Sequence, residues 1–316
     1  MGQVENGRAK RGAMMRMTFP VISAVALVVL IDTDRAMAWG PATHIGLADT
    51  VWGQLGAVPA ALAALLGRNR IPFLFGSIAA DMVFAKRLSR VKQFCHHWST
   101  GFALLGAARD ERAQAFAQGY LSHLAADTVA HGKYVPRQII LSGSSVNFGH
   151  FYWELRADSA AGQDAWTLLK EVLDHDHDTH HQVLNRHISG TFLPYGMNRA
   201  VFRAINELCM DQNVRRSLAT WHRYSPKGLD AGLLEAYRAE CVDRMISVLS
   251  EGERSPVLRE DPNGTPAFMQ LKVRRRERRR LGRRGCVADL SLREASLGLA
   301  PRATGDVQDP AHTTSS

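Results

Sequence analysis

The sequence lacks any segment in which apolar and polar residues alternate convincingly with a period of two. A half-buried β-strand shows that alternation, so its absence argues against a sheet. Apolar residues recur instead at helical spacing, and glycines and prolines fall between the apolar segments. We therefore expect an all-α, multi-helix bundle over residues 39–254. The expected helices cover 41–55, 58–67, 73–87, a short and then a long helix within 99–132, one that begins near 148, and 164–187, 197–222 and 228–250.

The sequence also lacks a long apolar run, since the apolar segment "TFPVISAVALVVLI" is too short for a comfortable membrane span. Its length is typical of a signal peptide, it follows a basic N-terminus, and it precedes Ala36-Met37-Ala38, an A-x-A cleavage pattern. We expect residues 1–38 to be a signal peptide, with Trp39 as the first residue of an exported, periplasmic or extracellular protein. The alternative is an uncleaved N-terminal anchor helix.

Cysteine is scarce, with 4 in 316 residues. Export would place these thiols in an oxidising compartment, where Cys209 and Cys241 could pair because they lie in the same helical region. Four free thiols are an equally good interpretation, because connectivity cannot be read from a sequence.

Residues 255–316 have little apolar content to pack. We expect a basic, low-order tail here, with a helical piece near 266–281. The formal net charge of +9 owes much to the run "KVRRRERRRLGRR", in which Glu277 is the one acidic residue. Contact of this run with anionic lipid or nucleic acid is possible in principle, but a solvated tail is the preferred interpretation.

Several residues of the expected bundle are suited to bind a metal. His123, Asp127 and His131 recur every four positions and would line one face of a helix. His150 and Glu154 repeat that spacing, which presents an imidazole and a carboxylate to one ion. Further candidates are His44, Asp81 and the pair His96 and His97. Buried ionisable groups are costly unless they are paired or bind metal, although hydrogen bonds alone can also satisfy them.

In this order the motifs resemble the bacterial zinc-dependent phospholipase C family, whose fold is shared with single-strand-specific nucleases that use three zinc ions. In that family the mature chain begins with a tryptophan whose backbone amino nitrogen and carbonyl oxygen bind zinc, a place that Trp39 matches. The resemblance makes eight further residues metal ligands, with His97 as the alternative to His96. They are His44, Asp81, His96, His123, Asp127, His131, His150 and Glu154.

The resemblance implies an all-helical domain with three zinc ions. Asp81, His96, His123 and Asp127 would hold one ion. Trp39, His44 and Asp127 would hold a second, so that Asp127 bridges two ions. The third set would be His131, His150 and Glu154. Asp81 would also act as the general base. The expected catalytic residues are therefore Asp81, as the base, and Asp127, as the carboxylate that bridges two ions.

The resemblance further implies hydrolysis of a phosphodiester, most simply a phospholipid head group at a membrane surface, and no obligate protein partner is evident. The short spacing from Trp39 to His44 is also a feature of the nucleases, so single-stranded nucleic acid is the alternative substrate. Glu154 in place of an aspartate favours the phospholipase. A zinc-stabilised helical module without catalysis is the alternative from another class.

A histidine-rich stretch, residues 174–187, is not part of this pattern. Acidic residues alternate with histidines in it, and no burial pattern surrounds it. We expect a solvated helix face here rather than a separate metal site.

Overall fold

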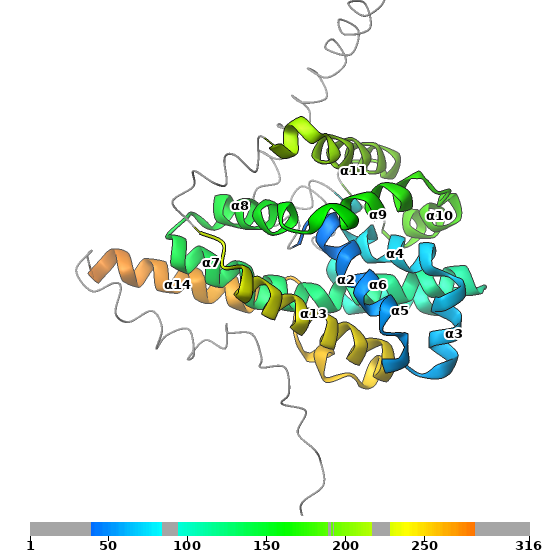
Figure 1. The fold of residues 1–316 in the computed structure, drawn as a ribbon. Helices are drawn as coiled ribbons and strands as arrows, with labels where there is room; N and C mark the ends of the chain where they lie inside the picture. Colours follow the sequence, from blue (N-terminus) through cyan, green and yellow to red (C-terminus); the bar gives the residue numbers. More distant parts are fainter. Residues whose placement is uncertain (1–38, 84–93, 189–190, 192, 217–227, 282–316) are drawn as a thin grey trace, which may run out of the picture.

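The computed structural model describes residues 39–83, 94–188, 191, 193–216 and 228–281. Within these ranges the fold is all-α and contains no strand, as expected (Figure 1). The α-helices are α2 (Pro41–Gly53), α3 (Ala60–Arg68), α4 (Arg70–Ala79), α5 (Trp98–Ala107), α6 (Glu111–Val129), α7 (Val135–Ser142), α8 (Val146–Ser159), α9 (Gly162–Asp174), α10 (Asp178–His187), α11 (Tyr195–Met210), α13 (Ala231–Glu251) and α14 (Thr265–Leu281).

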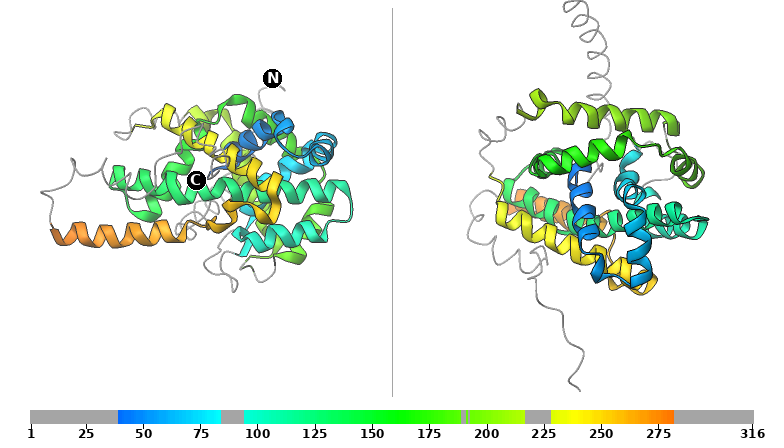
Figure 2. Two further views of the ribbon diagram at one scale, coloured as in Figure 1. Left: turned by 90° about the horizontal axis from the view of Figure 1, so that it is seen from below. Right: turned by 45° about the vertical axis from the view of Figure 1, so that its right-hand side comes forward.

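Helix α6 is the centre of the bundle. It packs against α4, α5 and α13, and Figures 1 and 2 show it enclosed by these helices. The Asp110 carboxylate caps its N-terminus by accepting a hydrogen bond from the Ala113 N–H at 2.7 Å. From Tyr120 to Val129 every residue of the helix is buried. The polar residues of this stretch therefore lie inside the core, where they need partners.

Two glycines allow α4 and α6 to cross in backbone contact. A Cβ atom on Gly119 would lie 1.9 Å from the Phe73 carbonyl oxygen, and one on Gly76 would lie 2.0 Å from the Phe116 carbonyl oxygen. Only residues without a side chain fit at such a distance, since the neighbouring atoms belong to the backbone and cannot rotate away. The crossing also brings Ser77, on α4, and His123, on α6, into hydrogen-bond contact.

Replacing Gly119 by Ala is expected to destabilise the protein by about 3 kcal/mol, the upper end of the cost of overpacking a core. Helix propensity alone would favour alanine by about 1 kcal/mol, so the clash decides the sign. Gly106→Ala is the matched control, because a Cβ on this residue of α5 meets nothing within 4 Å. Thermal unfolding measures both variants, and an equal melting temperature in the two would contradict the backbone contact.

Three expected helices end early. The helix expected over 197–222 is α11, which ends at Met210 because Asp211 adopts an extended backbone. The segment expected as one helix over 164–187 is two helices, α9 and α10, separated at His175–His177, where His175 adopts an extended backbone. The helix expected over 73–87 begins at Arg70, with Pro72 in its first turn, and ends at Ala79 before a 3₁₀ turn, Ala80–Met82, that carries Asp81. Residues 84–93 lie outside the described part of the chain.

Packing continues beyond the boundary expected at residue 254. A 3₁₀ turn (Pro256–Arg259) follows α13, and the helical piece expected near 266–281 is α14. Helix α14 contacts α7 and extends from one end of the body (Figure 2). Residues 255–271 therefore belong to the folded domain rather than to a low-order tail, because Val257, Phe268 and Leu271 are buried in its core. Residues 282–316 are outside the described ranges.

Cys95, Cys209 and Cys241 are free thiols in the structure, so the possible pair between Cys209 and Cys241 is not formed. None of the helices in the described ranges combines the length and the apolar character that crossing a bilayer requires. The expected signal peptide, residues 1–38, lies outside those ranges.

Candidate metal centre

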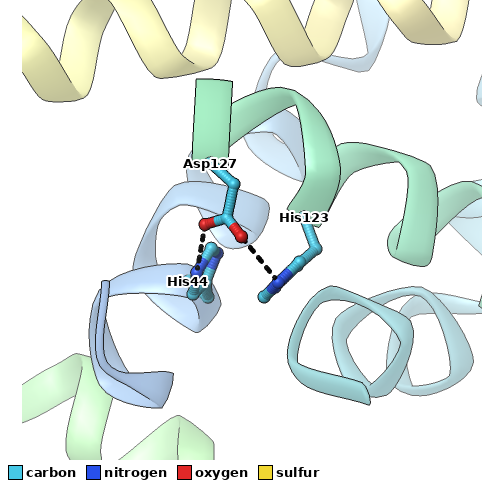
Figure 3. Close-up of side chains that lie close together, drawn as sticks. All are labelled: His44, His123 and Asp127. Carbon is cyan, nitrogen blue, oxygen red and sulfur yellow. Dashed lines mark ion pairs between the residues drawn. The ribbon is translucent and has the colours of Figure 1, made fainter. Parts of the chain in front are cut away.

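Asp127 of α6 lies between two histidines from different helices (Figure 3). One carboxylate oxygen, Oδ1, is 3.3 Å from Nε2 of His44 on α2. The other, Oδ2, is 3.2 Å from Nε2 of His123, one turn earlier on α6. All three side chains are buried, and their ligand atoms lie within 4.8 Å of one another. Each oxygen thus faces a different imidazole, which is the arrangement of a bridging carboxylate.

A second triad shares His123 with the first and consists of Asp81, His96 and His123. His96 Nε2 is 3.2 Å from Asp81 Oδ1 and 3.2 Å from Asp127 Oδ2. His96 is buried whereas His97 is exposed, so the structure selects His96 of the two candidates. The side chains expected around one ion, Asp81, His96, His123 and Asp127, are therefore brought together.

The third triad is His131, His150 and Glu154, as expected. His150 Nε2 is 2.5 Å from Glu154 Oε1, one helical turn away on α8. His131 follows Asp127 by four residues but lies in a π-helical turn, Ala130–Tyr134, that continues α6. A π-turn widens the helix and changes the direction of the side chains that follow, and such turns are frequent at functional sites. His131 lies in this π-turn and belongs to a different triad from His123 and Asp127.

Backbone carbonyl groups fix the orientation of two of these histidines. His123 Nδ1 donates to the Ser77 carbonyl oxygen at 2.8 Å, and His131 Nδ1 donates to the Pro262 carbonyl oxygen at 2.8 Å. A carbonyl group only accepts, so the proton of each ring is on Nδ1 and the lone pair of Nε2 is available to a metal.

The histidine nitrogens and carboxylate oxygens of the triads are better placed to bind a cation than to form hydrogen bonds with one another. Among the described residues, His44 Nε2, His131 Nε2 and both oxygens of Asp127 are buried without a partner in hydrogen-bond geometry. Buried polar atoms are satisfied in nearly all proteins, so this set of atoms fits a bound cation. Nitrogen from histidine and oxygen from carboxylates form the donor set that zinc takes.

The electrostatics of His131 and Asp127 favour the protonation states that metal binding needs, whereas at His123 burial lowers the pKa but the carboxylates of Asp127 and Asp81 raise it by more. Burial lowers the pKa of His131 to about 4, so this imidazole is neutral at pH 7. Burial acts to raise the pKa of Asp127, but the electrostatic effect of the nearby histidines, His123 above all, outweighs burial and holds that pKa well below its usual range. Metal ligands bind in these states, neutral imidazole and ionised carboxylate.

Trp39 lies one residue before the N-cap Gly40 of α2, the helix that carries His44. Its indole is buried and stacks on Tyr134, with ring centroids 4.6 Å apart. This packing places Trp39 in the core, and the role of its backbone atoms as ligands stays a prediction.

Asp158 is a residue of the site that the motif search missed. It lies four residues after Glu154 on α8, and its Oδ1 accepts hydrogen bonds from the Thr43 N–H at 2.7 Å and the Thr43 hydroxyl at 3.0 Å. It therefore ties the helix of the third triad to the first turn of α2, next to His44. Gly40 is required there, since its Cβ would lie 2.2 Å from Asp158 Cγ. The continued i, i+4, i+8 spacing of His150, Glu154 and Asp158 was the sequence signal.

The histidine-rich stretch is not a solvated face. His177, His180 and His181 are buried, and the His177 ring stacks on Phe75 with centroids 3.7 Å apart. These three histidines do not form a metal-binding triad: the described groups of clustered ligand atoms are the three named above. They pack as aromatic rings, because α10 folds back onto Phe75 and Phe116.

This packing predicts acid sensitivity. Burial lowers the pKa of His177 to about 4 from the ordinary value of 6.5. The unfolded chain takes up a proton at pH values at which folded His177 does not, so its contribution to stability is present above pH 6.5 and is lost as the pH falls from 6.5 to about 4. His177→Phe is expected to lose less stability over this range than the wild type, measured as melting temperature against pH. His175→Phe, at an exposed position, is the control and should keep the wild-type slope. A wild-type slope in both variants would contradict the prediction.

A cavity of about 410 Å³ opens between α2, α13 and Ala161, and its lining includes Thr43, Thr50, Glu235 and Arg238. None of the expected metal ligands lines it, so it is not the metal centre.

The fold and the buried triads define an all-helical protein with a candidate centre for several metal ions. A family model described as zinc-dependent phospholipase C matches residues 43–199, about half of the chain. The chain belongs to the zinc-dependent phospholipase C family through this region, which contains every expected ligand except Trp39. This confirms the resemblance of the motifs and supports a zinc-dependent hydrolase. No curated protein and no solved structure was found to match the chain.

Proposed function

We propose that this protein hydrolyses a phosphodiester bond of a phospholipid and releases the phosphorylated head group, with three zinc ions held by the residues described above. The observation that carries the proposal is the position of Asp127, whose two oxygens face ligand nitrogens of His44, His96 and His123 at 3.2–3.3 Å. A carboxylate shared in this way suits two adjacent metal ions, and paired ions are typical of enzymes that cleave phosphodiesters.

Zinc bound at such a paired site polarises the phosphodiester and makes a water molecule more acidic. The residues of the chain supply the rest. Ser77 and Pro262 hold His123 and His131 with Nε2 available as ligand. The pKa of Asp127 lies well below its usual range although burial acts in the opposite direction, so this carboxylate is ionised.

Asp81 is the proton acceptor in this proposal. Its carboxylate is buried beside His96, with Oδ1 3.2 Å from Nε2. In the reaction, the oxygen of a water molecule forms a bond to phosphorus while a carboxylate oxygen of Asp81 takes a proton of that water. The bond from phosphorus to the glycerol oxygen breaks, and the glycerol oxygen takes a proton from solvent water and leaves as the hydroxyl group of diacylglycerol. A carboxylate beside the attacking water suits this role.

We also propose that the chain is exported and cleaved after Ala38. The α-amino group of Trp39 would then join His44 and Asp127 as a ligand. The A-x-A pattern before Trp39 and the burial of Trp39 close to the start of α2 support this proposal. Export would bring the enzyme to phospholipid at a membrane surface.

The test uses the processed chain that begins at Trp39. Zinc per chain is measured by elemental analysis, and hydrolysis is assayed on phosphatidylcholine vesicles and on single-stranded DNA. We expect three zinc ions per chain and release of phosphocholine. Hydrolysis of DNA alone would reverse the assignment in favour of a nuclease. Full zinc content without hydrolysis of either substrate would indicate a zinc-stabilised helical module.

A further inference from the structure

A segment beyond the family-matched region lies across the third triad. It comprises residues 260–268, with the sequence "EDPNGTPAF", and is called the strap below. The family match ends at residue 199, so the strap is not part of the matched motif. It connects the 3₁₀ turn Pro256–Arg259 to the first turn of α14.

The strap contacts two metal-ligating histidines through hydrogen bonds. The Pro262 carbonyl oxygen accepts from Nδ1 of His131 at 2.8 Å. The Asn263 side chain donates from Nδ2 to the His96 carbonyl oxygen at 3.0 Å. These bonds join residues 131 and 167 positions apart in the sequence.

Several interactions hold the strap in one conformation. The Trp98 indole N–H donates to the Glu260 carbonyl oxygen at 2.9 Å, and the Glu260 carboxylate forms an ion pair with Arg244 at 2.5 Å. The Asp261 carboxylate accepts hydrogen bonds from the N–H groups of Asn263 at 2.9 Å and Thr265 at 3.1 Å. These contacts, none of which involves a side chain of the third triad, fix the conformation of the strap. A group held in this way can orient a metal ligand.

Gly264 lets the strap approach His131 closely. Its φ is +60°, and a Cβ atom there would lie 2.3 Å from the His131 carbonyl oxygen. Four residues later, the Phe268 ring stacks on the His150 ring with centroids 5.0 Å apart and an interplanar angle of 11°. The strap thus touches two of the three ligands of the third triad.

We propose that the strap is a positioning element of the third metal subsite. It fixes His131 in the Nδ1–H tautomer and holds Nε2 toward His150 and Glu154, so the affinity of this subsite depends on residues that the family match does not include. The part of the proposal that concerns zinc rests on the proposed function, while the part that concerns the tautomer does not.

The experiment compares Gly264→Ala with Gly252→Ala. Both glycines have positive φ, +60° and +58°, so alanine is disfavoured by the backbone at each, but a Cβ on Gly252 meets nothing within 4 Å. In Gly264→Ala we expect two zinc ions per chain instead of three after dialysis, and an affinity for the third ion that is about 10 to 100 times weaker, the usual effect of losing a supporting partner. Gly252→Ala should keep three ions.

A second readout does not depend on zinc. In the metal-free protein, ¹⁵N spectra of the histidine rings should show His131 as the Nδ1–H tautomer in the wild type and in Gly252→Ala, and as a mixture in Gly264→Ala. Phe268→Leu, a milder change, should weaken binding of the third ion without changing the tautomer of His131. This variant tests the proposal if Gly264→Ala fails to fold. Wild-type zinc affinity in Gly264→Ala and in Phe268→Leu would overturn the proposal, as would an unchanged tautomer in Gly264→Ala. Failure of the proposed function would appear separately, as a wild type without hydrolysis.

Discussion

Replacing Asp127 by Asn is expected to lower the zinc content by at least one ion per chain and to reduce kcat/KM about a thousandfold. An amide has one oxygen instead of two and no negative charge, so it cannot face His44 and His123 as the carboxylate does at 3.3 and 3.2 Å. Metal ions stabilise the transition state of phosphodiester cleavage by several kcal/mol, and about 4 kcal/mol corresponds to a thousandfold in rate. Elemental analysis and hydrolysis of phosphatidylcholine measure the two effects.

Asp49→Asn is the matched control for this substitution. Asp49 lies on α2 and pairs with Arg70 at the surface, away from the triads. Exposed ion pairs contribute little, so this variant should keep its zinc and its activity. A full zinc content in Asp127→Asn would contradict the bridging role of the carboxylate.

Removing zinc is expected to lower the melting temperature by about 10 °C or more. The triads place the buried carboxylates of Asp81, Asp127 and Glu154 in the core, and ionised groups at such depth depend on the cations around them. A ligand at about a thousand times its dissociation constant stabilises the folded state by about 4 kcal/mol, and each kcal/mol shifts the melting temperature of a domain of this size by about 2–4 °C.

Calorimetry of the protein before and after dialysis against a chelator measures the loss. Addition of zinc should restore the melting temperature, whereas magnesium should not, because magnesium prefers oxygen ligands and retains its waters. An identical melting temperature with and without zinc would show that the triads are satisfied by their mutual contacts alone.

The helical spacing predicted much of the centre. His123 with Asp127, and His150 with Glu154, each occupy one face of a helix, and residues four apart are neighbours whatever the rest of the fold does. The order of the motifs along the chain added His44, Asp81 and the His96 or His97 pair through the family resemblance. The choice of His96 needed the structure, since both histidines precede Trp98 and only their burial distinguishes them.

The remaining features depend on contacts that no local pattern contains. His177 and His180 are buried because α10 folds back onto Phe75 and Phe116, far away in the sequence. The strap resembles a turn-rich linker in composition, and its role depends on Trp98, His96 and His131, which precede it by more than a hundred residues. The π-turn at 130–134 likewise has no signature in a sequence dominated by α-helical spacing.

The hydrogen bond from His131 to the Pro262 carbonyl group bears on the order in which parts of the molecule fold during synthesis. All eight predicted ligand side chains from His44 to Glu154 are synthesised before the carbonyl group that orients His131 exists, because Pro262 follows His131 by 131 positions. A chain still emerging from the ribosome therefore has the residues of the third triad without the hydrogen bond that orients His131. Closing so long a loop is slow and entropically costly, which places completion of the third subsite late in folding. On the proposed function, a third ion would bind in its final arrangement only after Pro262 has been made.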